Sequence, residues 1–224
     1  LVKMIYGLVR PDSGKMRLFE SPYAPDEPRA ARAAGVAMVF QHFSLFEALT
    51  VAENIALGME NPPKPSALSA RITQVSEAYG LPLDPERLVG DLSAGERQRV
   101  EIVRCLLQDP KLLIMDEPTN FLDIETVDSL ISAANKYKGA LLLVSHSRLF
   151  LQKCATSYLS IVPGQFLTFD NLKTCEQATY TFIAELEAGT KVKIGAGALA
   201  KHGANAGSGS TSEVQNDISE GIAI

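Results

Sequence analysis

Three short apolar runs predict strands in the first two thirds of the chain. Val36 to Phe40 is typical of a strand covered on both faces, and so are Lys111 to Met115 and Ala140 to Val144. A helix predicted from about Ile124 to Tyr137 separates the last two runs. This alternation of strand, helix and strand predicts an α/β fold with a mostly parallel sheet at its core.

Helical patterns fill the region between the first two strands. Thr50-Val51-Ala52-Glu53 and Ser93-Ala94-Gly95-Glu96 both have the spacing of a capping box, so each predicts the start of a helix. A further helix is predicted over about residues 67 to 79. We therefore expect a helical subdomain, inserted at about residues 50 to 109.

The carboxyl-terminal third combines a hairpin, a helix and a tail. Tyr158 to Val162 and Gln165 to Phe169 are β-rich and are joined by Pro163-Gly164, which predicts a hairpin. A final helix is predicted from about Lys173 to Glu187. We expect one domain over residues 1–194 and a flexible Gly/Ala/Ser-rich tail over residues 195–224.

Composition narrows the class of protein. A chain of 224 residues that is 46% hydrophobic can bury one sizeable core. Its net charge of -5 provides no overall basic field for nucleic acid, although a local basic patch stays open. Its three cysteines form no C-x-x-C pair, and no run of 18 apolar residues is present. We therefore expect a cytosolic protein whose link to a membrane, if any, is a partner.

Two groups of residues are candidates for chemistry. Asp116 and Glu117 end an apolar strand, at the edge where open α/β sheets present groups to ligands. Ser93 and Gly95 stand at a predicted helix N-terminus, where unpaired N–H groups and the helix dipole favour anions. The alternatives are an acidic turn without function and, for Ser93, an ordinary N-cap.

A family resemblance connects these two groups. Leu92-Ser93-Ala94-Gly95-Glu96, followed by Leu112 to Thr119, resembles the signature sequence and Walker B segment of ATP-binding cassette (ABC) ATPases. The resemblance implies a P-loop NTPase-like fold with ATP and Mg²⁺ as cofactors. It also implies that Asp116 supports magnesium, usually through water, and that Glu117 polarises the water that attacks the γ-phosphate.

Further residues match motifs of the same family. Gln41 resembles the Q-loop glutamine, which contacts magnesium and water, and His146 resembles the switch histidine, which bonds the γ-phosphate. Asp123 resembles the D-loop aspartate, which communicates across a dimer of cassettes. Ser93 and Gly95 would contact the nucleotide held by that second cassette. The alternatives are a surface amide, a structural histidine and a helix N-cap, respectively.

One family motif does not occur in the sequence. No segment fits the phosphate-binding loop G-x-x-x-x-G-K-[ST], because Gly14-Lys15 is followed by Met16 and Val9 stands where the first glycine belongs. The run from Leu1 to Leu8 resembles the helix that follows this loop. We therefore expect the sequence to begin just past the loop, and the chain alone to have negligible ATPase activity.

The resemblance divides between two branches of the family. Residues 1 to about 118, above all Ala48 to Ile55, resemble importer ATPase subunits for simple sugars or nucleosides. From Glu117 onward, Asn120-Phe121-Leu122-Asp123 and Ser145 to Leu151 resemble the F subfamily, soluble tandem cassettes associated with translation. A recombined chain would account for the division.

The importer resemblance leads to the main functional hypothesis. The chain would be an ATP-binding and ATP-hydrolysing subunit that pairs with a second cassette and with transmembrane permease subunits, without direct nucleic-acid contact. It would lie at the cytoplasmic face of the membrane. The alternatives are an F-subfamily protein in translation and a non-hydrolytic cassette that supplies only its signature side. Arg97, Arg99 and Arg104 are expected to form a solvated, partly ion-paired face.

Overall fold

The computed structural model describes residues 1–162, 165–187 and 222–223, which belong to two compact units. Described residues 1–154 and 222–223 belong to the first unit, and described residues 155–162 and 165–187 belong to the second. Each unit is considered by itself.

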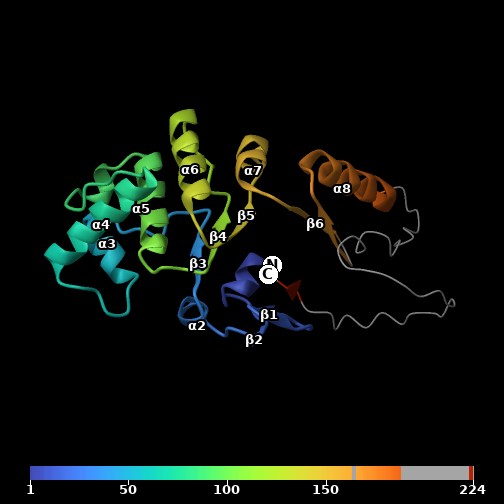
Figure 1. Cartoon of the computed structure of the whole chain (residues 1–224), viewed down its shortest axis with the longest axis horizontal. Coiled ribbons are helices and arrows are strands. Elements are labelled where there is room, and N and C mark those ends of the chain that lie inside the picture. Colours follow the sequence, from blue (N-terminus) through green and yellow to red (C-terminus); the bar gives the residue numbers. More distant parts are fainter. Residues whose placement is uncertain (163–164, 188–221, 224) are drawn as a thin grey trace. The chain divides into compact units, whose positions relative to one another are not determined.

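A parallel sheet of three strands forms the centre of the first unit (Figure 1). Its order is β3 (Val36–Val39), β4 (Leu112–Asp116) and β5 (Ala140–Val144), so β4 lies between the other two. Val39 pairs with Met115, and Asp116 pairs with Val144. The three carboxyl ends therefore lie at one edge, and the predicted α/β fold with a parallel sheet is confirmed.

Alternating side chains of β3 and β4 enter two separate cores. Consecutive residues of a strand point to opposite faces, and here both faces are covered. The sheet residues are Ala37, Val39, Leu113 and Met115 in one core and Val36, Met38, Leu112 and Ile114 in the other. The second core is closed by α1 (Val2–Ile5), β1 (Met16–Leu18), β2 (Ser21–Tyr23) and α2 (Pro28–Ala33).

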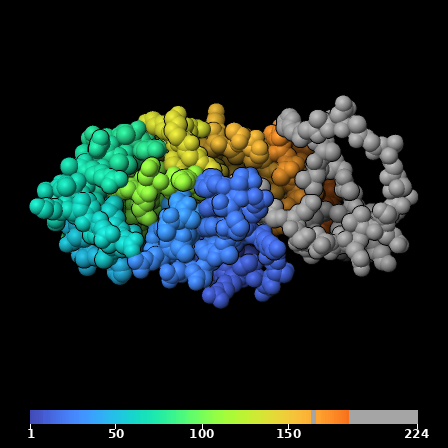
Figure 2. All heavy atoms as spheres, turned by 60° about the horizontal axis from the view of Figure 1, so that its bottom comes forward, coloured from blue at the N-terminus to red at the C-terminus, as the bar shows by residue number. Residues whose placement is uncertain are grey.

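Helices close the first core. They are α3 (Val51–Leu57), α4 (Pro65–Tyr79), α5 (Ala94–Leu106), α6 (Ile124–Lys136) and α7 (Arg148–Cys154), with a 3-10 turn at Val89–Asp91. Both predicted capping boxes are confirmed, since Thr50 caps α3 and Ser93 caps α5. In the space-filling view, the cyan and teal residues of α3 and α4 lie together, beside the blue residues of the amino-terminal part (Figure 2).

The amino-terminal part contains a hairpin that the sequence analysis did not predict. Two short strands, β1 and β2, pair antiparallel through a turn in which Phe19 and Glu20 both have positive φ. The opening helix ends at Ile5, and Gly7 then takes a φ of 77°. A short strand, β8 (Ile222–Ala223), pairs parallel with β1. The rest of the predicted tail lies outside the described residues.

The expectation that β5 is buried on both faces is wrong. Leu113 and Ile114 of β4 are at most 1% exposed, whereas Val144 of β5 is 38% exposed. The physical reason is position in the sheet: β4 has a neighbour on each side, but among the described strands β5 pairs with β4 alone. The apolar composition of β5 therefore exceeds what its present neighbours cover.

The second unit is the predicted hairpin with its helix. Strands β6 (Tyr158–Val162) and β7 (Gln165–Phe169) pair antiparallel, and α8 (Leu172–Glu187) packs on them. Ser160 and Thr179 contact one another through their hydroxyl oxygens, at 2.5 Å. Among the described residues of both units, we find no helix with the length and apolar character needed to cross a membrane.

Candidate functional site

The site begins where β4 ends. Asp116 is the last residue of β4, and the N–H of Glu117 donates to the carbonyl oxygen of Val144 at 2.7 Å. Glu117 has a φ of 49° and is only 9% exposed. A positive φ is uncommon in a residue other than glycine and costs backbone energy, so the surrounding fold must hold Glu117 in place. The result is a carboxylate fixed at the carboxyl edge of the sheet.

Glu117 and His146 are brought together, as the sequence predicted for residues of one site. The backbone N–H of His146 donates to Glu117 Oε2 at 3.2 Å, and His146 Nε2 lies 3.2 Å from Glu117 Oε1. The imidazole side chain is 96% exposed, so it can still meet a ligand. A held carboxylate beside an accessible imidazole can accept and relay a proton from water, which is the chemistry of a general base.

A hydroxyl contact that the sequence analysis missed joins the loops after β4 and β5. Thr119 Oγ1 lies 3.3 Å from Ser145 Oγ, and Ser145 Oγ also accepts the N–H of Ser147 at 3.1 Å. The sequence indicates this contact only weakly, because it shows no more than one hydroxyl residue after β4 and one after β5. This contact helps to hold the loop of Glu117 against the loop of His146.

Gln41 shares the same edge of the sheet. It stands two residues beyond Val39, whose partner in β4 is Met115, so the chain reaches the carboxyl edge close to Asp116. Gln41 is exposed, and among the described residues no hydrogen bond joins its amide to Glu117 or His146. Gln41 therefore follows β3 at the same edge of the sheet as Asp116, and no described hydrogen bond fixes its amide to Glu117 or His146.

These oxygen donors suit magnesium in part. Carboxylate and amide oxygens, such as those of Asp116 and Gln41, are hard ligands that Mg²⁺ accepts. Within the described part of the chain, no three His, Cys, Asp or Glu side chains are grouped so that they could hold a metal ion. The arrangement fits a magnesium ion that takes most of its ligands from water and phosphate, as Mg²⁺ commonly does.

Ser93 is the N-cap of α5, which was the alternative to a role in anion binding. Its Oγ accepts the N–H of Glu96 at 3.3 Å, and its own N–H donates to Glu96 Oε2 at 2.9 Å. This backbone N–H lowers the pKa of Glu96. Gly95 packs against α6, since a Cβ there would lie 2.7 Å from Thr126 Oγ1. Only glycine fits that approach without a shift of its neighbour.

Asp123 is likewise an N-cap, and it lies near the same contact. Its Oδ1 accepts the N–H of Thr126 at 2.7 Å, and this hydrogen bond lowers the pKa of Asp123. The start of α5 and the start of α6 therefore meet at Thr126, which brings Gly95 and Asp123 together. Ser93, Gly95 and Asp123 form a second group of site residues. Among the described residues, no hydrogen bond or ion pair joins this second group to Glu117 or His146.

Comparison with known protein families shows to which family a chain with these two groups of residues belongs. A family model described as "ABC transporter" matches residues 1–120, which include Gln41, Ser93, Gly95, Asp116 and Glu117 but neither Asp123 nor His146. This chain belongs to the ABC transporter family. Membership implies ATP binding, generally together with Mg²⁺.

Curated relatives of this ABC protein include two import proteins. The nucleoside import ATP-binding protein of Lactococcus lactis subsp. cremoris is 35% identical over 154 residues, which are 65% of this chain and 30% of the relative. The ribose import ATP-binding protein of Rhodococcus jostii is 32% identical over 154 residues, which are 65% of this chain and 31% of the relative. The match therefore spans under a third of either relative.

A solved structure supports the fold. The ADP-bound conformation of MJ1267, an ATP-binding cassette of an ABC transporter, superposes with a TM-score of 0.66 at 21% identity. The superposition covers 84% of this chain and 82% of the other. The inferred P-loop NTPase fold is thereby confirmed.

Proposed function

We propose that this ABC cassette is the ATP-binding and ATP-hydrolysing part of an importer-type transporter. The contact between Glu117 and His146 at the end of β4 carries the proposal, because it provides a base beside an accessible imidazole. The import proteins among its relatives support the direction of transport. The protein would act at the cytoplasmic face of the membrane, attached through its partners.

The edge residues have distinct roles under this proposal. Glu117 accepts a proton from water, and the N–H of His146 keeps one of its oxygens oriented. His146 Nε2 hydrogen-bonds the terminal phosphate. Asp116 and Gln41 would hold a magnesium ion, directly or through water, and this ion would neutralise charge on the phosphates.

The second group would serve a neighbouring cassette. Ser93, Gly95 and the first turn of α5 would meet the phosphate of a nucleotide held mainly by a second ABC subunit. Asp123, at the start of α6, would carry the state of one subunit to the other. The lack of a described hydrogen bond or ion pair between the two groups supports this division of labour.

The phosphate-binding loop would come from residues outside these 224. The exposure of β5 supports this proposal, because its apolar residues are only partly covered and, among the described strands, it pairs with β4 alone. A strand added there would lie beside the end of β5 and bring a following loop to the Glu117 edge. Without that loop, this chain alone would hydrolyse ATP negligibly.

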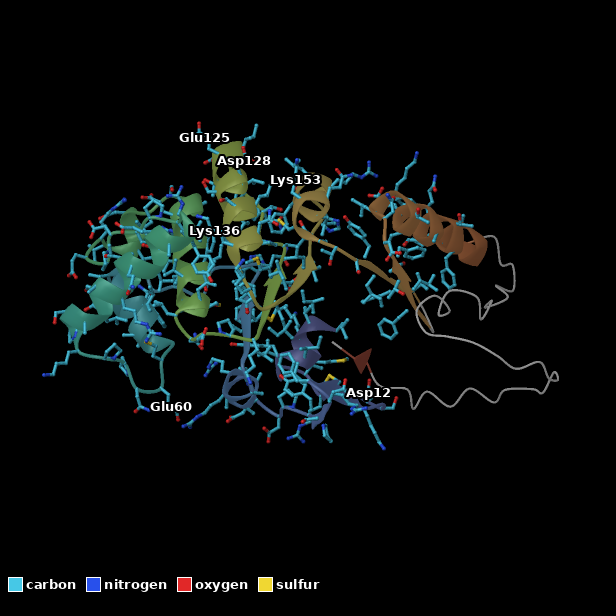
Figure 3. The ribbon with its side chains drawn as sticks, viewed as in Figure 1. Asp12, Glu60, Glu125, Asp128, Lys136 and Lys153 are labelled. Atoms are coloured by element: carbon cyan, nitrogen blue, oxygen red, sulfur yellow. The ribbon has the colours of Figure 1, made fainter. Side chains whose placement is uncertain are left out.

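A cleft of about 550 Å³ would receive the permease. It lies between α2 and the α3–α4 region, and its lining includes Arg29, Arg32, Arg71, Leu57, Met59 and Leu107. Glu60 lies in the loop between α3 and α4 (Figure 3). It forms an ion pair with Arg29. Three guanidinium groups against one carboxylate favour a docking segment that combines apolar and acidic side chains.

Affinity capture would test the partner. We would tag the protein that carries this chain, extract it from membranes and identify what purifies with it. Reversal of charge in the cleft, Arg32→Glu with Arg71→Glu, should release a permease, whereas Arg17→Glu, at an exposed ion pair outside the cleft, should retain it. Co-sedimentation with ribosomes and no permease would instead favour the F-subfamily function.

A further inference from the structure

Three charged side chains on one face of α5 contact the segment that follows Gln41. Arg97, Glu101 and Arg104 are spaced four and three residues apart, so they lie on one side of the helix. Arg97 pairs with Glu47 at 2.7 Å, while Glu101 and Arg104 both bond Ser44. The proposed ATPase mechanism gives none of these three charges a role.

Glu101 is the centre of this contact. It is 0% exposed and accepts the N–H of Ser44 at 2.7 Å, and it also forms an ion pair with Arg104. Desolvation raises the pKa of Glu101, and the positive charge of Arg104 opposes that rise. Replacing a buried ion pair with apolar residues is often neutral or stabilising, so the pair is a weak contributor to stability. The main effect of the pair is therefore to hold the backbone of Ser44 in place.

Arg104 completes the hold on Ser44. Its guanidinium donates to the carbonyl oxygen of Ser44 at 3.1 Å, so α5 binds both backbone polar groups of this residue. Asn54 of α3 does the same for Phe46, whose N–H and carbonyl oxygen lie 2.7 and 3.0 Å from the amide. The segment that begins three residues beyond Gln41 is therefore fixed to the helical part at two points.

The same arginine also contacts two residues that line the cleft. Gly58, which lines the cleft, lies so close to Arg104 that a Cβ on it would be 3.1 Å from Arg104 Cδ. Gln108, also in the lining, donates from its side chain to the carbonyl oxygen of Arg104 at 3.0 Å. A continuous set of contacts thus runs from the cleft through Arg104 to Ser44.

We propose that Glu101 and Arg104 are positioning residues that fix the Gln41 segment to α5. The position of Gln41, at the sheet edge that carries Asp116 and Glu117, would then depend on the position of α5, whose N-cap is Ser93. A partner bound in the cleft would change the position of both α5 and the Gln41 segment. The physical hold on Ser44 stands on the geometry alone. Its consequence for hydrolysis rests on the proposed function.

Amide hydrogen exchange of this chain tests the hold. The double variant Glu101→Leu/Arg104→Leu removes both charges together, so it leaves no unpaired buried charge and should fold. We expect the Ser44 amide to exchange about tenfold faster or more, while the amides of Ile114 in β4 keep their rate. Arg17→Leu, which breaks an exposed ion pair, is the matched control and should change neither rate. Equal rates at Ser44 in wild type and double variant would overturn the proposal.

Steady-state kinetics of the complete transporter test the consequence. The double variant should lower kcat with little change in the KM for ATP, because it displaces Gln41 without removing a nucleotide contact. Arg104→Lys, which keeps a cation, should recover part of the loss, as a purely structural defect would not. If exchange at Ser44 rises but kcat stays at the wild-type value, the positioning role is wrong. If wild type itself hydrolyses no ATP, the proposed function fails while the exchange result stands.

Discussion

Gly95→Ala should destabilise the protein, although alanine is the better helix former. The new Cβ would lie 2.7 Å from Thr126 Oγ1 and 3.1 Å from its Cγ2. Thr126 is 6% exposed and β-branched, so it has little freedom to rotate away. Overpacking of this kind costs about 1–3 kcal/mol. The gain in helix propensity is about 1 kcal/mol at most, so we expect a net loss of up to about 2 kcal/mol.

A compensating change separates the clash from other causes. Thr126→Ala removes both close atoms and leaves the Thr126 Cβ, at 3.4 Å, in ordinary contact. By itself this change should cost about 1 kcal/mol for the lost burial. The double variant should be more stable than the sum of the two single changes predicts, by about 1 kcal/mol or more. Urea unfolding of all four proteins measures this interaction energy. Simple additivity, or a more stable Gly95→Ala protein, would refute the reasoning.

Three other changes test local features of the fold. Glu20→Gly should raise the free energy of unfolding, measured in urea, by about 1 kcal/mol, because glycine adopts without strain the positive φ of the turn between β1 and β2. An unchanged free energy of unfolding would count against strain at Glu20. Gly7→Ala should cost about 2 kcal/mol in the same assay, since a Cβ at a φ of 77° would lie 2.8 Å from the carbonyl oxygen of Glu27; wild-type stability would contradict this. Asp123 has a lowered pKa in the folded state, so its stabilisation is present above the unfolded pKa and is lost as pH falls through the folded one. Asp123→Asn should flatten that acid limb of the stability curve, and an unaltered limb would argue against the cap.

Local signals allowed the sequence to predict much of the framework. The caps Thr50 and Ser93 depend on residues three positions apart, and the structure contains both capping boxes. The run of β5 predicted its bounds, Ala140 to Val144, but not its exposure, because exposure depends on neighbours in the sheet. The β1–β2 hairpin was missed because Phe19-Glu20 lacks the Asn-Gly type of turn signal.

The candidate site was predictable to the extent that it is built from strand ends. Glu117 and His146 follow neighbouring parallel strands, so their meeting follows from the predicted sheet. The link from Glu101 to Ser44 spans 57 residues and has no local pattern. The predicted ion pairs are present for Arg97 and Arg104. The expectation that Arg97, Arg99 and Arg104 form a solvated face is wrong, because all three are only partly exposed and the Nε atom of Arg99 is buried.

Hydrolysis by a Glu117→Gln variant tests the central claim most directly. Glutamine keeps the size of the side chain and removes its capacity to take a proton from water. In the complete ATPase with its partners, we expect kcat for ATP to fall about 100-fold or more while ATP binding is retained. A variant that hydrolyses ATP at the wild-type rate would contradict the assignment of this edge of the sheet as the catalytic site.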